Sequence, residues 1–247
     1  MKIFLLGFLF ICLIGCKPKP VTPPVTPNET ARILINPSFG QNSLFLDSIY
    51  QGPNGIRIKI TDINFYTTLL SCQNNLFAEV GYFDFRDKGN LLVEQTLDYA
   101  NFPSLSLVLG VDTSLNHDDP SAFPNDSPLN IMNAGVMHWG WNTGYIFISV
   151  EGKADTLVDG VDNFNVSFSY HIGTDTYLQA LNFNNVPWEK TNDHQHTLAL
   201  KLDMEQFFFN QQQPIDIANE PFTHSGAGFA TLTQKVAVNF KNALTLP

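Results

Sequence analysis

Cysteine is scarce in this sequence, and the positions of the three cysteines leave none to pair. Cys12 and Cys16 lie near the N-terminus, and Cys72 is the only cysteine in the rest of the chain. With residue 12 in a cleaved leader and residue 16 lipidated, as argued below, Cys72 can form no intrachain disulfide. The fold must then be stabilised by packing, even in an oxidising compartment.

Basic residues and catalytic motifs are also few. The chain has 13 Lys and Arg against 23 Asp and Glu, so no basic patch is available to neutralise phosphates, and we expect no nucleic-acid binding. It contains no Gly-x-Ser-x-Gly elbow, no His-Glu-x-x-His helix and no phosphate loop. Carboxylate pairs such as Asp118 and Asp119 occur in any acidic protein and do not by themselves indicate a glycosidase. We therefore expect that the protein is not an enzyme.

One long apolar run exists, at the start of the chain. "MKIFLLGFLFICLIGC" is too short to span a bilayer, which takes a helix of about 20 residues, and it has the form of a signal peptide over residues 1–15. Its ending, Leu-Ile-Gly-Cys, resembles a bacterial lipobox, which predicts diacylation of Cys16. We expect a membrane-anchored protein of the bacterial cell envelope. Lys17 follows the cysteine, where an aspartate would signal inner-membrane retention in some bacteria, so the outer membrane is favoured.

A proline-rich stretch follows the anchor. "KPKPVTPPVTPNET" cannot join a helix or a sheet, because proline fixes φ and removes a donor. We assign residues 16–31 to an extended tether, in which a dozen residues of about 3.1 Å each would hold a domain about 35 Å from the membrane. Residues 32–247 are then one folded domain.

The domain is expected to be all-β. Short runs of alternating apolar residues, such as "RILINPSF", "SLSLVLGVD" and "YIFISVEG", are separated by Gly, Pro, Asn and Asp, which is typical of an antiparallel β-sandwich. The apolar parity changes between Ile60 and Ile63, which predicts a β-bulge near residues 61 and 62. Helices are expected only late, one short in "DMEQFFFNQQ" and one over residues 229–244, where apolar residues recur every three or four positions and would cap one end of the sandwich.

Six histidines are the first candidates for metal chemistry, since imidazole suits copper and zinc. His171 has the opposite parity to Phe168 and Tyr170, so it faces away from the core, where it is either a ligand or a solvated surface residue. His194 and His196 share one strand face and could chelate a metal, but "TNDHQH" is also a polar turn, which we favour. His224 in "FTHSGAG" is a weaker candidate.

Two other segments combine histidine with unusual surroundings. His117 lies in "SLNHDDPSAFPNDSPLN", whose Asn, Asp and Pro usually form turns, although such carboxylates could also hold calcium. In "MHWGWN", His138 precedes two of the three tryptophans, Trp139 and Trp141, with a glycine between them that lets the indoles splay around a tight backbone. The tryptophans either shield a metal or plug one end of the sandwich.

Taken together, "LGVDTSLNHDDPSAFPNDSPLN", "MHWGWNTGYIFISVEG", "FNVSFSYHIG" and the late "LTQKVAVNFKNAL" resemble the MbnP-like family of envelope copper-binding proteins, which occur beside methanobactin systems. The resemblance covers nearly the whole mature chain. It implies a β-sandwich with one copper ion, as Cu(I) or Cu(II). In some members it also implies a tryptophan oxidised to kynurenine by a partner dihaem enzyme related to cytochrome c peroxidases.

The resemblance assigns roles to particular residues. His117 and His171 occupy the matching histidine positions, and Trp139 or Trp141 would be modified or would cover the metal. His138 is an additional histidine and a candidate third ligand. If both matched imidazoles bind one ion through bonds of about 2 Å, their nitrogens should lie about 3 to 4 Å apart.

Many relatives carry a cysteine shortly after the His-x-Gly motif. Here residues 174–177 are Thr, Asp, Thr and Tyr, so that disulfide is not expected.

Two functions remain open from the sequence. The first is a copper-binding lipoprotein that buffers or delivers the metal. The alternative is a binding module without metal that recognises a glycan or a protein through exposed Trp139, Trp141 and Trp188.

Overall fold

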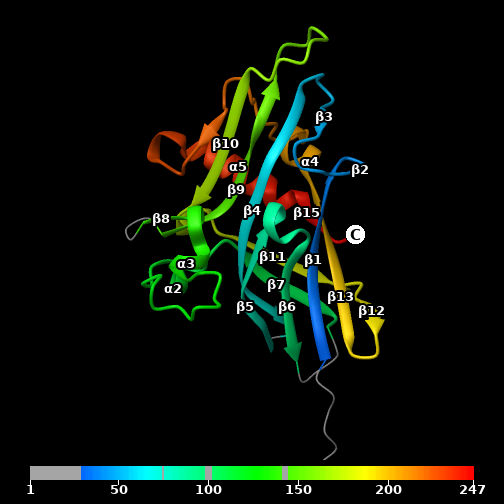
Figure 1. The fold of residues 1–247 in the computed structure, drawn as a ribbon, viewed down its shortest axis with the longest axis vertical. Coiled ribbons are helices and arrows are strands. Elements are labelled where there is room, and N and C mark those ends of the chain that lie inside the picture. The colour runs from blue at the N-terminus through cyan, green and yellow to red at the C-terminus, as the bar shows by residue number, and fades with distance from the viewer. Residues whose placement is uncertain (1–28, 74, 98–101, 141–143) are drawn as a thin grey trace, which may run out of the picture.

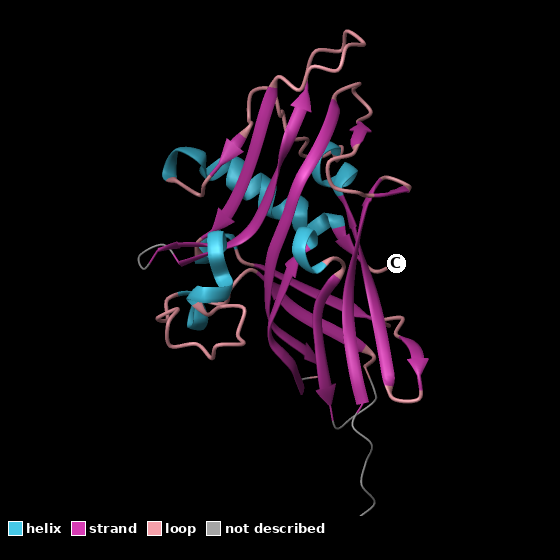
Figure 2. Ribbon diagram, in the orientation of Figure 1, coloured by secondary structure: helices cyan, strands magenta, loops and turns pink. Residues whose placement is uncertain are grey.

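The computed structural model describes residues 29–73, 75–97, 102–140 and 144–247, which form two β-sheets with helices packed beside them (Figure 1; Figure 2). The mostly-β fold expected from the sequence is confirmed. The predicted signal peptide, the predicted lipidation site Cys16 and Trp141 lie outside the described residues. No helix within those residues is long and apolar enough to cross a membrane.

The first sheet, sheet A, is organised around its N-terminal strand. Its six described strands are β1 (Glu29–Phe39), β2 (Asn42–Ser43), β6 (Leu91–Leu97), β12 (Glu189–Asn192), β13 (Gln195–Asp203) and β15 (Leu244–Thr245). Strand β1 runs between β6 and β13 and begins at Glu29, three residues before the predicted domain boundary at Arg32. The tether was therefore predicted too long. No proline lies between Pro27 and Pro37, so the backbone N–H groups of residues 28–36 are free to join a sheet.

The second sheet, sheet B, carries the candidate functional residues. Its nine described strands are β3 (Ile49–Gln51), β4 (Arg57–Cys72), β5 (Asn75–Asp84), β7 (Ser104–Leu109), β8 (His138–Gly140), β9 (Gly144–Asp155), β10 (Val166–Gly173), β11 (Gln179–Asn184) and β14 (Phe222–Thr223). The register of β4 against β9 shifts between Ile60 and Asp62, so the predicted bulge is confirmed. Because of this shift, Ile58, Ile60 and Ile63 are all buried, and Asp62 is not drawn into the core.

Two strand pairs are parallel rather than antiparallel. Strand β13 runs parallel to β1, with Thr30 opposite Gln195, and β14 runs parallel to β10. The antiparallel sandwich expected from the sequence therefore holds apart from these two pairs. Each parallel pair joins segments far apart in the chain, which the short-range turn pattern of the sequence does not report.

Short helices pack beside both sheets in the described part of the chain. They are α1 (Phe85–Lys88), α2 (Thr113–Asn116), α3 (Ile131–Ala134), α4 (Met204–Phe209) and α5 (Ala230–Ala243), with short 3-10 turns η1 (Gly135–Met137), η2 (Asp175–Tyr177) and η3 (Ala227–Phe229). Both predicted late helices are present, as α4 and α5. Helix α5 contacts strands of both sheets and crosses behind sheet B in Figure 1, and its Phe240 packs edge-on against Phe65 and Phe207. We call the face of sheet B toward α4 and α5 the inner face, and the opposite one the outer face.

Candidate functional site

The outer face of sheet B is covered by the long segment between β7 and β8. This segment, residues 110–137, carries α2, α3 and η1 and is seen beside the sheet in Figure 1. Two fully buried tyrosines hold it down: the hydroxyl of Tyr66 donates to the carbonyl of Pro128 at 3.2 Å, and the hydroxyl of Tyr145 donates to the carbonyl of Leu129. The cover is therefore fixed to β4 and β9 by polar anchors beneath it.

Polar side chains form two rows across this outer face. In one row, the strand registers place Asp84, Asn64, Ser149 and His171 opposite one another on β5, β4, β9 and β10. In the next row they place Asp62, Glu151 and Ser169 opposite one another. Asn64 and Ser149 are each only 5% exposed, so the middle of the stripe is buried. Buried polar groups cost free energy unless they are hydrogen-bonded, so the partners of this stripe at its two ends are of interest.

The β10 end of the stripe contains two histidines and a glutamate. The Nε2 atom of His171 lies 2.7 Å from Oε1 of Glu151 and 3.2 Å from Oγ of Ser169. The His224 ring, just after β14, meets the His171 ring edge-on, with centroids 4.9 Å apart and an interplanar angle of 75°. We call His171, His224 and Glu151 the strand-end cluster.

Electrostatics favour an ionised Glu151 and a neutral His224. The hydrogen bond from His171 holds the pKa of Glu151 below its usual value, more than burial raises it. Burial lowers the pKa of His224, and the neighbouring His171 lowers it further. No hydrogen bond joins the His224 ring to another described side chain, so at neutral pH it presents unprotonated nitrogen as a potential ligand.

Trp139 covers the end of the same strand. A Cβ atom placed on Gly173 would lie 2.5 Å from Cζ3 of Trp139, so the indole rests directly on the glycine two residues after His171. The backbone N–H of Gly173 donates to Oγ of Ser225, and that hydroxyl donates to the carbonyl of His171, which ties the segment of His224 to β10. Trp139 therefore packs at the end of the strand that carries His171, while Trp141 falls outside the described residues.

His117 lies in a separate network. Its Nε2 atom is 2.9 Å from Oδ2 of Asp175, and the amide of Asn116 donates to Oδ1 of the same carboxylate at 2.8 Å. Burial raises the pKa of Asp175, but these hydrogen bonds outweigh it, and the net shift is downward. The side chain of Asn116, 1% exposed, also accepts the backbone N–H of Tyr145 at 2.9 Å. His117 and His171, which the resemblance pairs, thus have different carboxylate partners.

His138 packs on an aromatic ring. Its imidazole meets Tyr145 edge-on, with centroids 4.7 Å apart, and burial lowers its pKa. This position favours a structural role over that of a third ligand.

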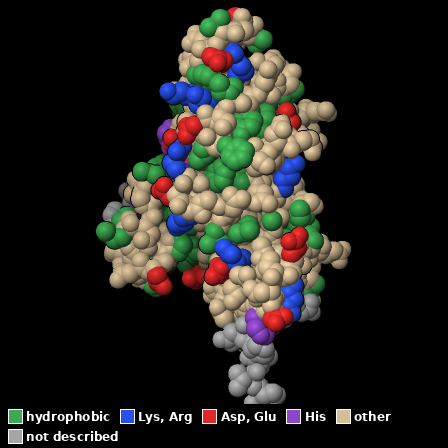
Figure 3. Space-filling view, turned by 45° about the vertical axis from the view of Figure 1, so that its right-hand side comes forward, with side chains coloured by type: hydrophobic (Ala, Val, Ile, Leu, Met, Phe, Trp, Pro, Cys, Tyr) green, Lys and Arg blue, Asp and Glu red, His purple; other side chains and the backbone are tan. Residues whose placement is uncertain are grey.

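His194 and His196 form a second cluster with a carboxylate, at the other end of the molecule. Nδ1 of His194 lies 3.3 Å from Oε1 of Glu29, and Nε2 of His196 lies 3.1 Å from Oε2. Hydrogen bonds from both imidazoles, that of His194 first, lower the pKa of Glu29 against the opposing effect of burial. Histidine and acidic side chains are seen together on the surface at the lower end of Figure 3. We call these three residues the tether-end cluster, because the predicted tether precedes Glu29.

The sequence did not identify the carboxylates that complete these clusters. Glu151 could have been found from strand parity. It lies two residues after Ser149 on β9, so it faces the same side of the sheet as Ser149 and as His171 on the neighbouring strand. Glu29 was assigned to the tether, and Asp175 has no recognisable motif. Among the described residues, no three His, Cys, Asp or Glu side chains converge as ligands of one metal ion.

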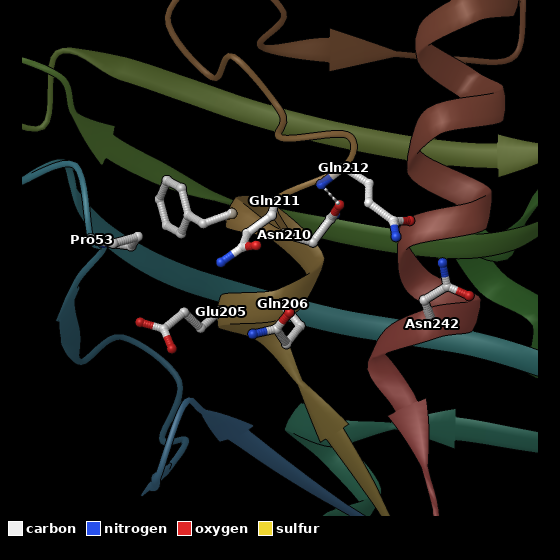
Figure 4. A pocket seen from close by; sticks show the side chains of 8 residues that line it. Pro53, Glu205, Gln206, Asn210, Gln211, Gln212 and Asn242 are labelled. Carbon is white, nitrogen blue, oxygen red and sulfur yellow. Dashed lines mark hydrogen bonds between the residues drawn. The ribbon is translucent and has the colours of Figure 1, made fainter.

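A cleft without histidine lies elsewhere, between α4, the end of α5 and the turn before β4. It has a volume of about 610 Å³, and amide side chains dominate its wall: Gln206, Gln211, Gln212 and Asn242, with Glu205 at one side (Figure 4). Such a wall suits a neutral, hydrogen-bonding ligand rather than a transition metal.

Comparisons with known proteins place the fold. No curated protein matches this chain in sequence. The family model MbnP matches residues 28–225. Among solved structures, MbnP from Methylosinus trichosporium is similar in fold, with a TM-score of 0.50 and 15% sequence identity over 81% of each chain. The family match extends over both histidine clusters and most of the two sheets, so this chain belongs to the MbnP family.

Proposed function

We propose that this protein is an envelope-tethered, copper-binding lipoprotein associated with methanobactin-type copper acquisition, which buffers or delivers the metal. The proposal rests on one observation above others: two imidazoles of the strand-end cluster face each other with centroids 4.9 Å apart, beside the carboxylate of Glu151. Family membership supports it.

The donors of the strand-end cluster fit copper chemically. Imidazole nitrogen with carboxylate oxygen is a set that Cu(II) accepts, and intrinsic affinity favours copper over the other divalent first-row ions. His171 and His224 would supply nitrogen, and Glu151 would either bind the ion or orient His171 through its hydrogen bond. The indole of Trp139, resting on Gly173, would limit access of water and oxidants from one side.

A partner enzyme belongs to the same proposal. In it, Trp139 or Trp141 is oxidised to kynurenine by a dihaem enzyme related to cytochrome c peroxidases. Mass spectrometry of peptides from the native host would locate the modification. Unmodified tryptophan at both positions would remove the partner from the proposal and leave copper binding to be judged separately.

Copper content after exposure and chelator competition test the central claim. We expect about one copper per chain in the wild type, and at least about tenfold weaker binding in His171→Ala and His224→Ala, because even residues that only orient metal ligands change affinity about 10- to 100-fold. His196→Ala, in the tether-end cluster, is the matched control and should bind as the wild type does. Substoichiometric copper in the wild type, unchanged by His171→Ala, would contradict the proposal.

The cleft in Figure 4 favours one alternative, a metal-independent module that binds a glycan or a protein. Two of the tryptophans expected to serve it have packing partners within the chain: Trp188 packs on Phe77 and Phe102, and Trp139 packs on Gly173, while Trp141 lies outside the described residues. Its recognition would fall to the amides of the cleft. Glycan-array binding that is lost in Gln206→Ala and is indifferent to copper would favour this alternative.

The anchor is proposed on the sequence alone. Cys16→Ala should leave the domain folded and release it from outer-membrane fractions. A variant protein that still pellets with membranes after a salt wash would show that the lipobox interpretation is wrong.

A further inference from the structure

The far end of the polar stripe, away from the histidines, holds a small pocket. It has a volume of about 220 Å³ and lies where α3 and η1 approach β4, β5 and α1. Its acidic and amide lining comes from Asp62 and Asn64 on β4 and from Asp84 and Asp87 at the start of α1. Asn64 stands opposite both Asp84 and Ser149 in the strand register, so the pocket continues the row that ends at His171.

Two oxygen atoms in this pocket lack a donor. Oδ1 of Asp62 and Oδ1 of Asn64 are buried and have no hydrogen-bond partner among the described residues. The amide of Asn64 is oriented by its side-chain hydrogen bond to the Asp62 carboxylate, in which only the nitrogen can donate. Its oxygen is therefore directed elsewhere, and the side chain lines the pocket while only 5% exposed. Buried acceptors without donors are rare in native proteins and call for a water molecule or an ion.

The charge of the lining favours a cation. Three of the lining side chains are carboxylates and one, Arg86, is a guanidinium. Arg86 is already engaged, because it donates to Oδ2 of Asp47 at 3.1 Å and to the carbonyl of Thr61. Asp84 uses Oδ1 to accept the backbone N–H of Asp87, which leaves its other oxygen available. Lys88 lies over the ring of Tyr82 and is not part of the lining.

The geometry points to a binding site for a hard divalent cation, Ca²⁺, held by the side-chain oxygens of Asp62, Asn64 and Asp84. Carboxylate and amide oxygens without nitrogen or sulfur are the donors that Ca²⁺ prefers, and its flexible shell of six to eight oxygens accepts water for the rest. The bound ion would join β4 to β5 at the base of α1, beneath the cover of α3. This site is separate from the strand-end cluster in donor chemistry, and it does not rest on the proposed copper function.

Calcium binding is tested on the whole mature chain after removal of metals with a chelator. We expect saturable calorimetric heat for about one Ca²⁺ per chain, a rise in thermal midpoint with added Ca²⁺, and luminescence of Tb³⁺ in the same site sensitised by the nearby Tyr82. Asp62→Asn should weaken Ca²⁺ binding at least tenfold. Glu189→Gln, an exposed acid on β12 of the other sheet, is the control and should bind as the wild type does.

A second variant keeps the test decisive if Asp62→Asn folds poorly. Asn64→Leu removes the unpartnered oxygen with little change in volume, so we expect it to raise the thermal midpoint of the metal-free protein and to abolish the rise with Ca²⁺. Absence of saturable heat and of Tyr82-sensitised luminescence in the wild type would overturn the proposal, since the pocket would then hold water alone. So would wild-type Ca²⁺ affinity in both variants. Copper binding measured on the same samples reports on the other site independently.

Discussion

The strand-end and tether-end clusters have the same composition, two histidines and one glutamate, but a different arrangement. At the tether end, Glu29 lies between the two imidazoles and gives one oxygen to each. At the strand end, the imidazoles of His171 and His224 meet each other, and Glu151 contacts only one of them. In the first arrangement each imidazole has a hydrogen bond to the carboxylate, whereas in the second the His224 ring has none. Residue composition alone would therefore not distinguish a structural cluster from a candidate metal site.

The surroundings of the two clusters also differ. The strand-end cluster lies beside a covered face, with Trp139 resting on Gly173 and residues 110–137 fixed to β4 and β9. The tether-end cluster closes the parallel pair of β1 and β13 at the point where the described chain begins, and the N–H of Thr30 donates to the carbonyl of His194 nearby.

The largest effect is expected when the indole is displaced. In Gly173→Ala, the new Cβ would lie 2.5 Å from the Trp139 ring and 2.7 Å from the carbonyl oxygen of Tyr145, and the backbone oxygen cannot simply rotate away. We expect a loss of about 3 kcal/mol in the free energy of unfolding, the upper range for overpacking, together with a red-shifted tryptophan emission. Gly228→Ala is the control, because nothing lies within 4 Å of its added Cβ. Denaturant melts followed by fluorescence measure both quantities, and equal stability of the two variants would show that Trp139 is not seated on the strand.

A smaller effect is expected from the anchor of the cover. Asn116→Ala leaves the N–H of the fully buried Tyr145 without its acceptor and removes a donor from Asp175. An unsatisfied buried donor of this kind costs about 2 kcal/mol. Hydrogen exchange should show the loss concentrated in residues 110–137 and the start of β9. Uniform destabilisation, reaching the tether-end cluster equally, would contradict the role of Asn116 as a local anchor.

The sequence predicted the elements better than the contacts between them, and the reason is physical. Strand parity identified the bulge near Asp62 and the outward direction of His171, because both depend on residues two positions apart. The spacing of Leu232, Val236 and Phe240 likewise predicted α5.

The partners of the histidines could not be found in this way. Glu151 meets His171 only because β9 and β10 pair in one register, and His224 arrives through β14, which pairs in parallel across a long connection. A shift of one residue in either pairing would dissolve the cluster while leaving every local pattern unchanged. Glu29 was missed for a different reason, since its neighbours in sequence are the prolines of the tether.

A smaller effect is expected from His138, which we predict does not bind copper with the strand-end cluster. Its half-buried ring lies against Tyr145, and burial lowers its pKa, which favours the neutral imidazole. His138→Phe keeps the edge-on ring contact, and we expect a change in the free energy of unfolding below about 1.5 kcal/mol with unchanged copper affinity. Chelator competition compares this variant with His171→Ala. A loss of copper equal to that of His171→Ala would make His138 a ligand and reverse the conclusion drawn from its packing.

The smallest effect, and the most direct comparison of the two clusters, is their response to acid. The pKa of His224 in the folded protein lies below its ordinary value of 6.5, so the unfolded chain takes up the proton first. The contribution of His224 to the stability of the fold therefore decreases as the pH falls below 6.5. The pKa of Glu29 is held below 4.5, so its contribution is complete above that pH and is lost only as pH falls through the lowered value. Relative to the wild type, His224→Gln should therefore gain stability as the pH is lowered below 6.5. Glu29→Gln should be less stable than the wild type at neutral pH by an amount that stays constant until the pH falls below about 4.5, where the difference narrows. Urea melts of the wild type, the two single variants and the double variant across this pH range measure both profiles, and the double variant checks that the two effects are additive. If the two single variants had the same pH profile, the two clusters would be electrostatically equivalent, and uncommitted imidazole would no longer distinguish the strand end.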